Sequence, residues 1–341
     1  KSFGFMNIAI VGATGNVGRK IIEILEKKQI DIENLFLLAS KNSEGKKINY
    51  NGKEHTVNDL EKFDFASVNI VFFAAGSGVA EKWAHVAAEK TIVIDNSKYF
   101  RKDPDIPLIV PEVNSKKLAD VKNKNIIANA NCSVIPVVVA LKPLHDLYSI
   151  NRIVVSTYQS VSGAGKSAMD ELLSQTKDYF ENKKLESKNF TKQIAFNAIP
   201  HIDSFLENGY TKEEQKTTDE IKKILDKKIK VTSTCVRIPV LVSHCISANV
   251  EFNKKCDLKE IKNVLSSSPG CKVIDEHKDG EYITPVDAED KFETFISRIR
   301  LDESQANTIN LWIVSDNLVK GAALNAVQIA EGLIKNDLYG K

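Results

Sequence analysis

Apolar runs of strand length alternate with helix-like stretches through the first part of the chain. Asn7 to Val11 is one such run, and Arg19 to Lys28 follows it with isoleucine and leucine at helical spacing. A second helix candidate, rich in alanine, lies between Gly78 and Lys90. Further strand candidates are Leu35 to Ala39, Val68 to Ala74 and Thr91 to Ile94. Strands that alternate with helices are typical of a parallel, doubly wound sheet.

The pattern changes in the second part of the chain. Ser133 to Tyr148 and Lys166 to Phe180 have helical periodicity, with a β-branched strand candidate, Arg152 to Gln159, between them. The lysine- and glutamate-rich stretch from Leu185 to Lys230 predicts surface helices and loops. Later strand candidates are Val231 to Ile238, Ile246 to Phe252, Phe292 to Leu301 and Ile309 to Ser315. Clustered strands favour a mixed, largely antiparallel sheet, and a face that helices leave uncovered often becomes a subunit interface.

These patterns predict an α/β protein of two domains. We expect residues 6–130 to form the doubly wound domain, and residues 131–317 to form an α+β domain around the mixed sheet. The C-terminal segment, residues 318–341, contains an amphipathic helix candidate that would return to the first domain. Residues 1–5 precede Met6 and are interpreted as a vector remnant or upstream readthrough.

Composition narrows the class of protein. The 47 lysines and arginines nearly balance 45 aspartates and glutamates, and a net charge of +2 gives no general attraction to nucleic acid or anionic membranes. The densest apolar run, Val134 to Leu141, is interrupted by Pro136 and is too short to span a bilayer. No charged-then-apolar leader opens the chain. We therefore expect a cytoplasmic protein that binds neither nucleic acid nor membrane.

The cysteines predict lone thiols. There are five of them, widely spaced and without a C-x-x-C pair, which argues against a disulfide framework and against a zinc site. A cysteine that matters in this chain would therefore act as a single thiol.

A glycine-rich loop separates the first strand candidate from the first helix candidate. Its spacing, Gly12-x-x-Gly15-x-x-Gly18, is a variant of the dinucleotide-binding pattern. Glycines let backbone N–H groups approach a pyrophosphate at the helix N-terminus, whereas the simpler interpretation is a plain strand-to-helix turn. After the second strand, Ser40, Lys41 and Ser43 stand where an NAD site usually has an acid, and the first acid is Glu44. Hydroxyls and a lysine suit a 2′-phosphate, which favours NADP.

Three polar residues of the second part are candidates for chemistry. Cys132 directly precedes a predicted helix, whose dipole and free N–H groups would stabilise a thiolate; alternatively it is a small buried apolar residue. His244 would be an acid or base, or simply a hydrogen-bonded histidine. Arg237, flanked by apolar residues, would bind an anion or form a salt bridge. The small residues from Ser156 to Gly165 either line a site or start a helix.

Taken together, these segments make the chain recognisable over essentially its whole length. It closely resembles bacterial aspartate-semialdehyde dehydrogenases. The matching motifs are GATGNVG (12–18), DNSKYFRKDPDIPLIVPEVN (95–114), NCS (131–133), STYQSVSGAG (156–165), TCVRIPVLVSH (234–244) and LWIVSDNLVKGAALNAVQIAE (311–331). The resemblance implies a Rossmann-type domain joined to a mixed-sheet catalytic domain that also makes a homodimer.

The resemblance also implies roles for the matching residues. Cys132 would be the nucleophile that forms an acyl-thioester, His244 the general acid/base, and Gln159 the residue that orients the substrate beside the thiol. The implied substrate contacts are Arg237 for the α-carboxylate, Glu213 for the ammonium group, and Arg101, Asn131 and Lys216 for phosphate. The implied cofactor contacts are Gly12, Thr14, Gly15, Asn16, Val17, Ser40, Ser43, Ser162, Gly163 and Asn317.

The chain departs from the family pattern at three positions. Ala130 stands where proline is common and Pro136 where glutamine is usual; a proline in a first helical turn is tolerated. Asn42 occupies the place where many members have an arginine for the 2′-phosphate. The expectation of NADP therefore rests on Lys41 and Ser43.

The activity implied by the resemblance is the NADP-dependent reductive dephosphorylation of 4-phospho-L-aspartate to L-aspartate 4-semialdehyde, with release of inorganic phosphate. This step belongs to the biosynthesis of lysine and diaminopimelate, threonine and methionine. One alternative is an N-acetyl-γ-glutamyl-phosphate reductase, whose acetylated substrate would not need the carboxylate of Glu213. Another is a catalytically silent NADP-binding regulatory protein, which would not need Cys132, Gln159 and His244.

Overall fold

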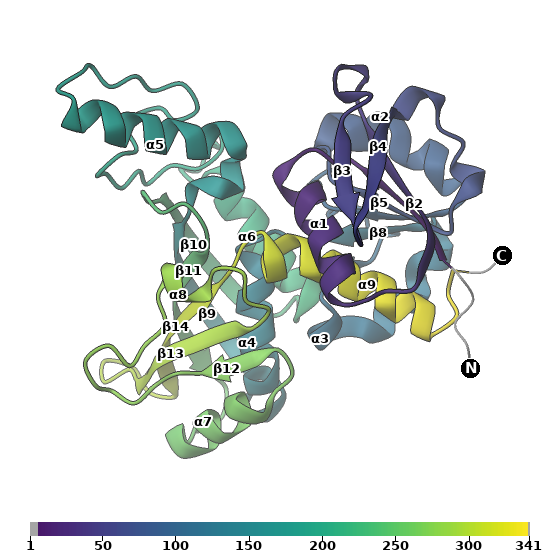
Figure 1. The fold of residues 1–341 in the computed structure, drawn as a ribbon. Helices are drawn as coiled ribbons and strands as arrows, with labels where there is room; N and C mark the ends of the chain where they lie inside the picture. Colours follow the sequence, from purple (N-terminus) through teal and green to yellow (C-terminus); the bar gives the residue numbers. More distant parts are fainter. Residues whose placement is uncertain (1–5, 340–341) are drawn as a thin grey trace. The chain divides into compact units, whose positions relative to one another are not determined.

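An eight-stranded sheet organises the first part of the chain. The structure is a computed structural model that describes residues 6–339, and the chain divides into two compact units (Figure 1). Unit 1 extends to Ala130 and includes the chain from Ala322 onwards, whereas unit 2 comprises Asn131 to Gly321. The predicted fold class, a doubly wound domain and a second domain with a mixed sheet, is confirmed.

Unit 1 is built around a mostly parallel sheet of strand order β3-β4-β2-β1-β5-β6-β8-β7. Its strands are β1 (Met6–Val11), β2 (Ile32–Ala39), β3 (Lys47–Tyr50), β4 (Lys53–Asp59), β5 (Ile70–Phe73), β6 (Ile92–Asp95), β7 (Leu108–Ile109) and β8 (Ile126–Asn129). Its α-helices are α1 (Asn16–Lys27), α2 (Ser77–Ala88), α3 (Pro111–Asn114) and α9 (Leu324–Lys335). Within residues 6–339, the β3–β4 hairpin is antiparallel and the other neighbouring strands of this sheet are parallel.

The central strands of unit 1 are buried on both faces. Every residue of β5 and β6 is buried, as helix-covered parallel strands require. The crossovers through α1 and α2 run in opposite directions along the sheet, so right-handed connections place these helices on opposite faces. Helix α9 packs beside α1 (Figure 1). The strand order reverses at β1, and the carboxyl ends of β1 and β5 thus flank the crevice where doubly wound folds bind ligands.

Unit 2 contains a six-stranded mixed sheet of order β10-β9-β11-β14-β13-β12. Its strands are β9 (Ile150–Gln159), β10 (Lys230–Arg237), β11 (His244–Phe252), β12 (Cys271–Val273), β13 (Thr294–Leu301) and β14 (Thr308–Ser315). Its α-helices are α4 (Val134–Tyr148), α5 (Lys166–Phe180), α6 (Lys212–Ile224), α7 (Leu258–Ser267) and α8 (Pro285–Ala288). The pairs β9–β10 and β12–β13 are parallel, and the other neighbours are antiparallel.

The two faces of this second sheet differ. Helices α4, α6 and α7 pack against it, and the inward residues of β9 are the buried set Ile153, Val155, Thr157 and Gln159. The alternate residues point to the opposite face and are at least partly exposed, including Arg152, Ser156 and Tyr158. A strict period of two with one wet face is the pattern of a half-covered sheet.

Several elements differ from the sequence expectations. The β3–β4 hairpin and β8 were not predicted, because short or polar segments carry little periodicity. Helix α7 was not predicted either, although Leu258, Ile261 and Leu265 have helical spacing. The predicted surface character of residues 185–230 is wrong for α6, where Glu213, Glu214 and Glu220 are all buried. A π-helical turn, Val319–Ala323, precedes α9. The interpretation of residues 1–5 lies outside the described residues.

No helix within residues 6–339 combines the length and apolarity needed to cross a bilayer. In the same range, three or more His, Cys, Asp or Glu side chains nowhere gather closely enough to hold a metal ion. None of the five cysteines, all of which lie within the described residues, forms a disulfide bond, as the sequence predicts.

Candidate active site

Three candidate residues lie together at the ends of neighbouring strands in the sheet of unit 2. Gln159 ends β9 and Arg237 ends β10, and the parallel register places these two residues opposite each other. His244 begins β11, which runs antiparallel to β9, so its start lies at the same edge. All three side chains are buried. Cys132 lies two residues before α4 and contacts His244, which brings the helix N-terminus to this edge.

The thiol and the imidazole form the centre of the site. Sγ of Cys132 lies 3.1 Å from Nε2 of His244. The other ring nitrogen, Nδ1, accepts the backbone N–H of Ser160 at 3.0 Å. A neutral imidazole that accepts at Nδ1 carries its proton on Nε2, so the ring presents a donor to Cys132. The sulfur of Cys132 also lies 3.4 Å from Oδ1 of Asn131, an acceptor for the thiol proton.

The histidine is electrostatically biased towards its neutral form. Complete burial, reinforced by the nearby Arg237 guanidinium, lowers the pKa of His244 well below its ordinary value of 6.5. It is therefore uncharged at neutral pH. By contrast, burial raises the pKa of Cys235 and of Cys245 to about 12, which makes those two thiols poor nucleophiles.

Arg237 is a buried cation beside this pair. Its Nη1 donates to the carbonyl oxygen of Ser160 at 2.7 Å, and desolvation lowers its pKa from the usual value. A Cβ added at Gly163 would lie 3.2 Å from both Nη1 of Arg237 and Nε2 of His244. Glycine at this position lets the backbone approach both polar groups closely, as a ligand-lining turn requires.

A charged cluster connects α6 to the residue before the thiol. Nδ2 of Asn131 donates to Oε1 of Glu213 at 2.5 Å, and Nζ of Lys216 lies 3.1 Å from Oε2 of Glu213. Asp203 lies 3.1 Å from the same ammonium. Burial favours the neutral amine, but the two carboxylates outweigh it and hold the pKa of Lys216 above its usual value. The backbone N–H of Asn131 donates to the buried carboxylate of Glu220 at 2.7 Å.

The remaining predicted residues of unit 2 complete the surroundings. The hydroxyl of Thr157 donates to Oε1 of Gln159 at 2.9 Å, which fixes the orientation of that amide. Oδ1 of Asn317 accepts the backbone N–H of Ser243 at 2.8 Å, and Nδ2 donates to the hydroxyl of Ser162 at 2.9 Å. Asn317 therefore connects the residue before His244 to the side chain of Ser162.

Unit 1 contains a cavity of about 640 Å³ at the reversal point of its sheet. Its lining includes Val11, Gly12, Thr14, Gly15, Ser40, Lys41, Asn42, Ser43, Asp59, Glu61, Ala74, Lys82 and Trp83. Gly12 has φ +85°, and a Cβ there would lie 2.4 Å from the carbonyl oxygen of Ala74. No acidic side chain lies in the first turn of α1, so its free N–H groups suit an anion. The loop thus fits a dinucleotide.

The structure also places the last predicted phosphate contact. Arg101 belongs to unit 1, where Nε donates to the carbonyl oxygen of Asn129 at 2.8 Å and Nη2 to that of Asn96 at 3.0 Å. Main-chain carbonyls therefore fix the direction of its guanidinium.

Two contributors to the site are absent from the sequence predictions, and a third was predicted only as part of a segment. Ser160 lies in the segment Ser156 to Gly165 that could line a site, but its own role was not predicted, because it contributes its backbone N–H and carbonyl, which any residue would supply. Asp203 is one acid in a polar loop, and Glu220 is one of many in the lysine- and glutamate-rich stretch. For Glu220 a signal exists in its position one helical heptad after Glu213, on the same face of α6.

Comparison with known proteins places this geometry in a family. Residues 7–121 match the family model "Semialdehyde dehydrogenase, NAD binding domain", and residues 141–320 match "Semialdehyde dehydrogenase, dimerisation domain". Aspartate-semialdehyde dehydrogenase of Aquifex aeolicus is 49% identical over 335 residues, which cover 97% of this chain and 98% of the relative. The chain belongs to the aspartate-semialdehyde dehydrogenase family.

Solved members of the aspartate-semialdehyde dehydrogenase family share the fold. Aspartate semialdehyde dehydrogenase II from Vibrio cholerae superposes with a TM-score of 0.95 at 47% identity, covering 97% of this chain and 99% of that one. The same Vibrio protein has been solved in complex with ASA. The resemblance drawn from the motifs is confirmed, the chain is an oxidoreductase, and unit 1 contains its NAD(P)-binding domain.

Proposed function

We propose that the protein catalyses the NADP-dependent reductive dephosphorylation of 4-phospho-L-aspartate to L-aspartate 4-semialdehyde through a thioester on Cys132. The observation that supports this most directly is the 3.1 Å contact between the Cys132 thiol and His244, next to the buried guanidinium of Arg237. The product enters the biosynthesis of lysine and diaminopimelate, threonine and methionine. None of the five cysteines within residues 6–339 forms a disulfide bond, which suits the reducing cytoplasm where we place the enzyme.

Substrate recognition follows from charge. The planar guanidinium of Arg237 is suited to bidentate pairing with the α-carboxylate, and the carboxylate of Glu213 to pairing with the α-ammonium. Lys216 pairs with Glu213 and Asp203, and the third N–H of its ammonium group could donate to a phosphate oxygen. Gln159, oriented by Thr157, would hold the acyl group beside the sulfur.

The first chemical stage forms the thioester. The sulfur of Cys132 attacks the acyl carbon as the thiol loses its proton; the C–S bond forms, the bond from the acyl carbon to the phosphate oxygen breaks, and the departing inorganic phosphate takes up that proton. The proton on Nε2 of His244 faces the developing charge. Lys216, Asn131 and Arg101 would offset the charge of the departing phosphate.

The second stage is reduction. When bound, NADPH supplies a hydride to the thioester carbonyl carbon. The N–H at Nε2 of His244 would hydrogen-bond the oxyanion of the adduct; as the C–S bond breaks, the aldehyde leaves, and one proton taken up from solvent at the sulfur restores the thiol. Ser162, Gly163 and Asn317 surround His244 and are the residues of unit 2 that would contact the cofactor. In unit 1 the cofactor would contact the glycine loop through Gly12, Thr14, Gly15, Asn16 and Val17.

The preference for NADP is supported by the far end of the cavity in unit 1. Ser40 and Ser43 supply hydroxyls, and Lys41 supplies a cation, in the turn where a 2′-phosphate would lie. Asn42 occupies the family's arginine position and contributes no charge. The charge of Lys41 is therefore the main attraction that this turn offers to NADP.

A homodimer is supported by the wet face of the sheet in unit 2, which lies within the part matched as a dimerisation domain. Tyr158 is 38% exposed and its ring lies 5.4 Å from that of Trp312, so the face carries aromatic area as well as polar groups. Aromatic residues are enriched where protein surfaces associate.

Two other functions are less well supported. An N-acetyl-γ-glutamyl-phosphate reductase would leave the carboxylate of Glu213 buried without a substrate ammonium to bind. A silent NADP-binding protein would have no use for the contact between Cys132 and His244.

One assay tests the proposal. Oxidation of aspartate semialdehyde with NADP, followed at the nicotinamide absorbance, should require inorganic phosphate. Cys132→Ala should abolish turnover, because the thioester cannot form, whereas Cys256→Ala, a matched change at another partly exposed cysteine, should leave it intact. If Cys132→Ala kept more than trace activity, Cys132 would not be the nucleophile.

The same preparation decides the cofactor. The kcat/KM for NADPH should exceed that for NADH, because the 2′-phosphate gains the contacts of Ser40, Lys41 and Ser43. A preference for NADH of about tenfold or more would refute the NADP assignment.

A further inference from the structure

Gln175 is a buried glutamine that serves the backbone of a loop. It lies on α5 with only 2% of its surface exposed. Its Oε1 accepts the backbone N–H groups of Ile194 and Ala195, each at 3.0 Å, and its Nε2 donates to the carbonyl oxygen of Glu186 at 2.8 Å. One side chain thus binds three main-chain groups, of which the N–H groups of the fully buried Ile194 and Ala195 would otherwise lack these acceptors.

A second buried side chain on α5 holds the same loop. Glu171, one helical turn before Gln175, accepts the backbone N–H of Asn189 at 3.0 Å and also that of Lys188. The loop has no helix or strand of its own between residues 183 and 199, so side chains of α5 take the place of a hydrogen-bonded ladder. Its conformation depends on these two residues.

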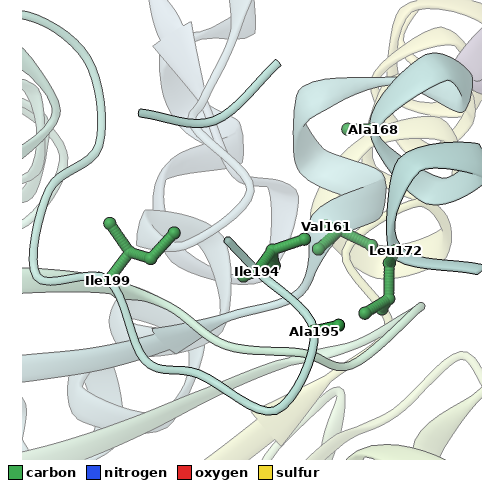
Figure 2. Close-up of a cluster of buried hydrophobic side chains, with 6 residues drawn as sticks. All are labelled: Val161, Ala168, Leu172, Ile194, Ala195 and Ile199. Carbon is green, nitrogen blue, oxygen red and sulfur yellow. The ribbon is translucent and has the colours of Figure 1, made fainter. Parts of the chain in front are cut away.

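The loop is packed as well as hydrogen-bonded. Ile194 and Ala195 are fully buried and belong to an apolar cluster with Val161, Ala168, Leu172 and Ile199. Figure 2 shows this cluster, in which side chains of α5 lie close to those of the loop and of the turn that starts at Val161. Val161 follows Ser160, which contacts both His244 and Arg237.

The loop ends on the strand that carries the substrate-binding arginine. The backbone N–H of Ile199 donates to the carbonyl oxygen of Arg237 at 2.9 Å, and that of Arg237 donates to the carbonyl oxygen of Ile199 at 2.8 Å. On its other side, β10 pairs with β9 at Gln159. Ile199 therefore adds a bridge on the outer edge of β10, at the residue where the strand ends.

We propose that Gln175 is a positioning residue for the substrate carboxylate: by fixing residues 194–199 it holds the backbone of Arg237, and with it the guanidinium, in the direction that binding needs. The proposal rests on the proposed role of Arg237. A bidentate pairing tolerates little angular error, so a small rotation of this backbone weakens binding of the substrate without touching the thiol or the cofactor.

The direct test is a KM-against-kcat comparison in the full-length enzyme. Gln175→Leu keeps the approximate volume of the side chain but leaves the Ile194 and Ala195 N–H groups without an acceptor. We expect KM for aspartate semialdehyde to rise roughly 10- to 100-fold, with kcat and KM for NADP nearly unchanged. Gln175→Glu retains the acceptor oxygen, so its KM should return most of the way to the wild-type value. Gln175→Asn is one methylene shorter and should raise KM less than Gln175→Leu does. It replaces the leucine variant in the test if that variant does not fold.

A matched control separates positioning from stability. Leu265→Ala removes a fully buried side chain of α7 and should lower Tm without changing KM. If Gln175→Leu and Gln175→Asn lower Tm and leave KM unchanged, Gln175 has only a structural role and the proposal is overturned.

Arg237→Lys distinguishes failure of this inference from failure of the proposed function. If Arg237→Lys raises KM and the Gln175 variants do not, only the inference is lost. If Arg237→Lys does not raise KM, Arg237 does not bind the substrate carboxylate. Both the inference about Gln175 and the role proposed for Arg237 are then refuted. If both changes raise KM, Gln175→Leu should add little in the Arg237→Lys background, because the two act through the same contact. If the effects of Gln175→Leu and Arg237→Lys on KM were fully additive in free energy, Gln175 would not act through Arg237.

Discussion

At the scale of the residue, His244 is defined by the backbone around it. The N–H of Ser160 occupies Nδ1, so the neutral ring faces Cys132 with a proton on Nε2. Complete burial and the guanidinium of Arg237 keep the ring neutral. In this state Nε2–H of His244 is a hydrogen-bond donor towards negative charge that develops on the substrate, and it does not remove the proton of the resting thiol.

This arrangement predicts a pH-dependent stability. The pKa of His244 is lower in the folded protein than the value of about 6.5 expected when unfolded, so below that pH the unfolded chain binds a proton that the folded chain does not. The free energy of unfolding should therefore fall as pH drops below about 6.5, by up to about 1.4 kcal/mol per pH unit from this residue. Urea unfolding between pH 5 and pH 7 measures it.

Two variants isolate the contribution of His244 to the pH dependence of the unfolding free energy. His244→Gln removes the titrating ring, so its unfolding free energy should depend less steeply on pH than that of the wild type. His85→Gln replaces an exposed histidine and should keep the wild-type slope. Equal slopes for wild type and His244→Gln would contradict the assignment of a buried, neutral imidazole.

At the scale of the element, the site is made where secondary-structure elements end. β9 and β10 end together, β11 begins beside them, and α4 begins just after Cys132. Helix α6 contributes its first turns: Thr211 and Glu214 form a capping box, which places Glu213 and Lys216 next to Asn131. Glu214 also accepts the backbone N–H of Cys235 at 2.9 Å, which connects the start of α6 to β10.

The cap of α6 should therefore influence both stability and substrate binding. Thr211→Ala removes the hydroxyl that accepts the N–H of Glu214 and should cost about 1 kcal/mol of unfolding free energy. It should also raise KM for aspartate semialdehyde, because the first turn carries Glu213. Thr284→Ala breaks the capping box of α8 and should lower stability without raising KM. If both variants leave KM unchanged, the cap of α6 does not position Glu213.

At the scale of the whole molecule, each unit has a distinct task. Unit 1 combines a glycine loop with a cavity at the reversal of its parallel sheet, and α9 returns the end of the chain to it. Unit 2 combines the chemical groups with a sheet that has one wet face. A two-fold interface would place this face against the same face of a second copy.

The proposed homodimer can be tested on that face. Tyr158→Arg adds a charge at an exposed aromatic position and should shift sedimentation from dimer towards monomer, since each two-fold contact would bring the charge in twice. Val86→Arg makes the same change at an exposed apolar residue of α2 and should leave the sedimentation coefficient unchanged. A Tyr158→Arg protein that sediments like the wild type would place the interface elsewhere.

Local patterns in the sequence were sufficient to predict many of the helices and strands of this protein. The apolar runs and their periodicity predicted α1, α4, α5 and most central strands, because burial imposes its period on neighbouring residues. The glycine loop and the lone thiol before a helix were visible for the same reason, as each is a short segment with its own chemistry. The motifs then identified the family.

The tertiary structure alone decided which polar groups meet. Glu213 and Glu220 lie in a stretch that reads as a solvated surface, yet both are buried against Asn131. Gln175 has an ordinary helical context, and only its loop partners show what it holds. Nothing local encodes such contacts, because hydrogen bonds between distant residues depend on the path of the whole chain, whereas hydrophobic periodicity depends only on the nearest turn of helix or strand.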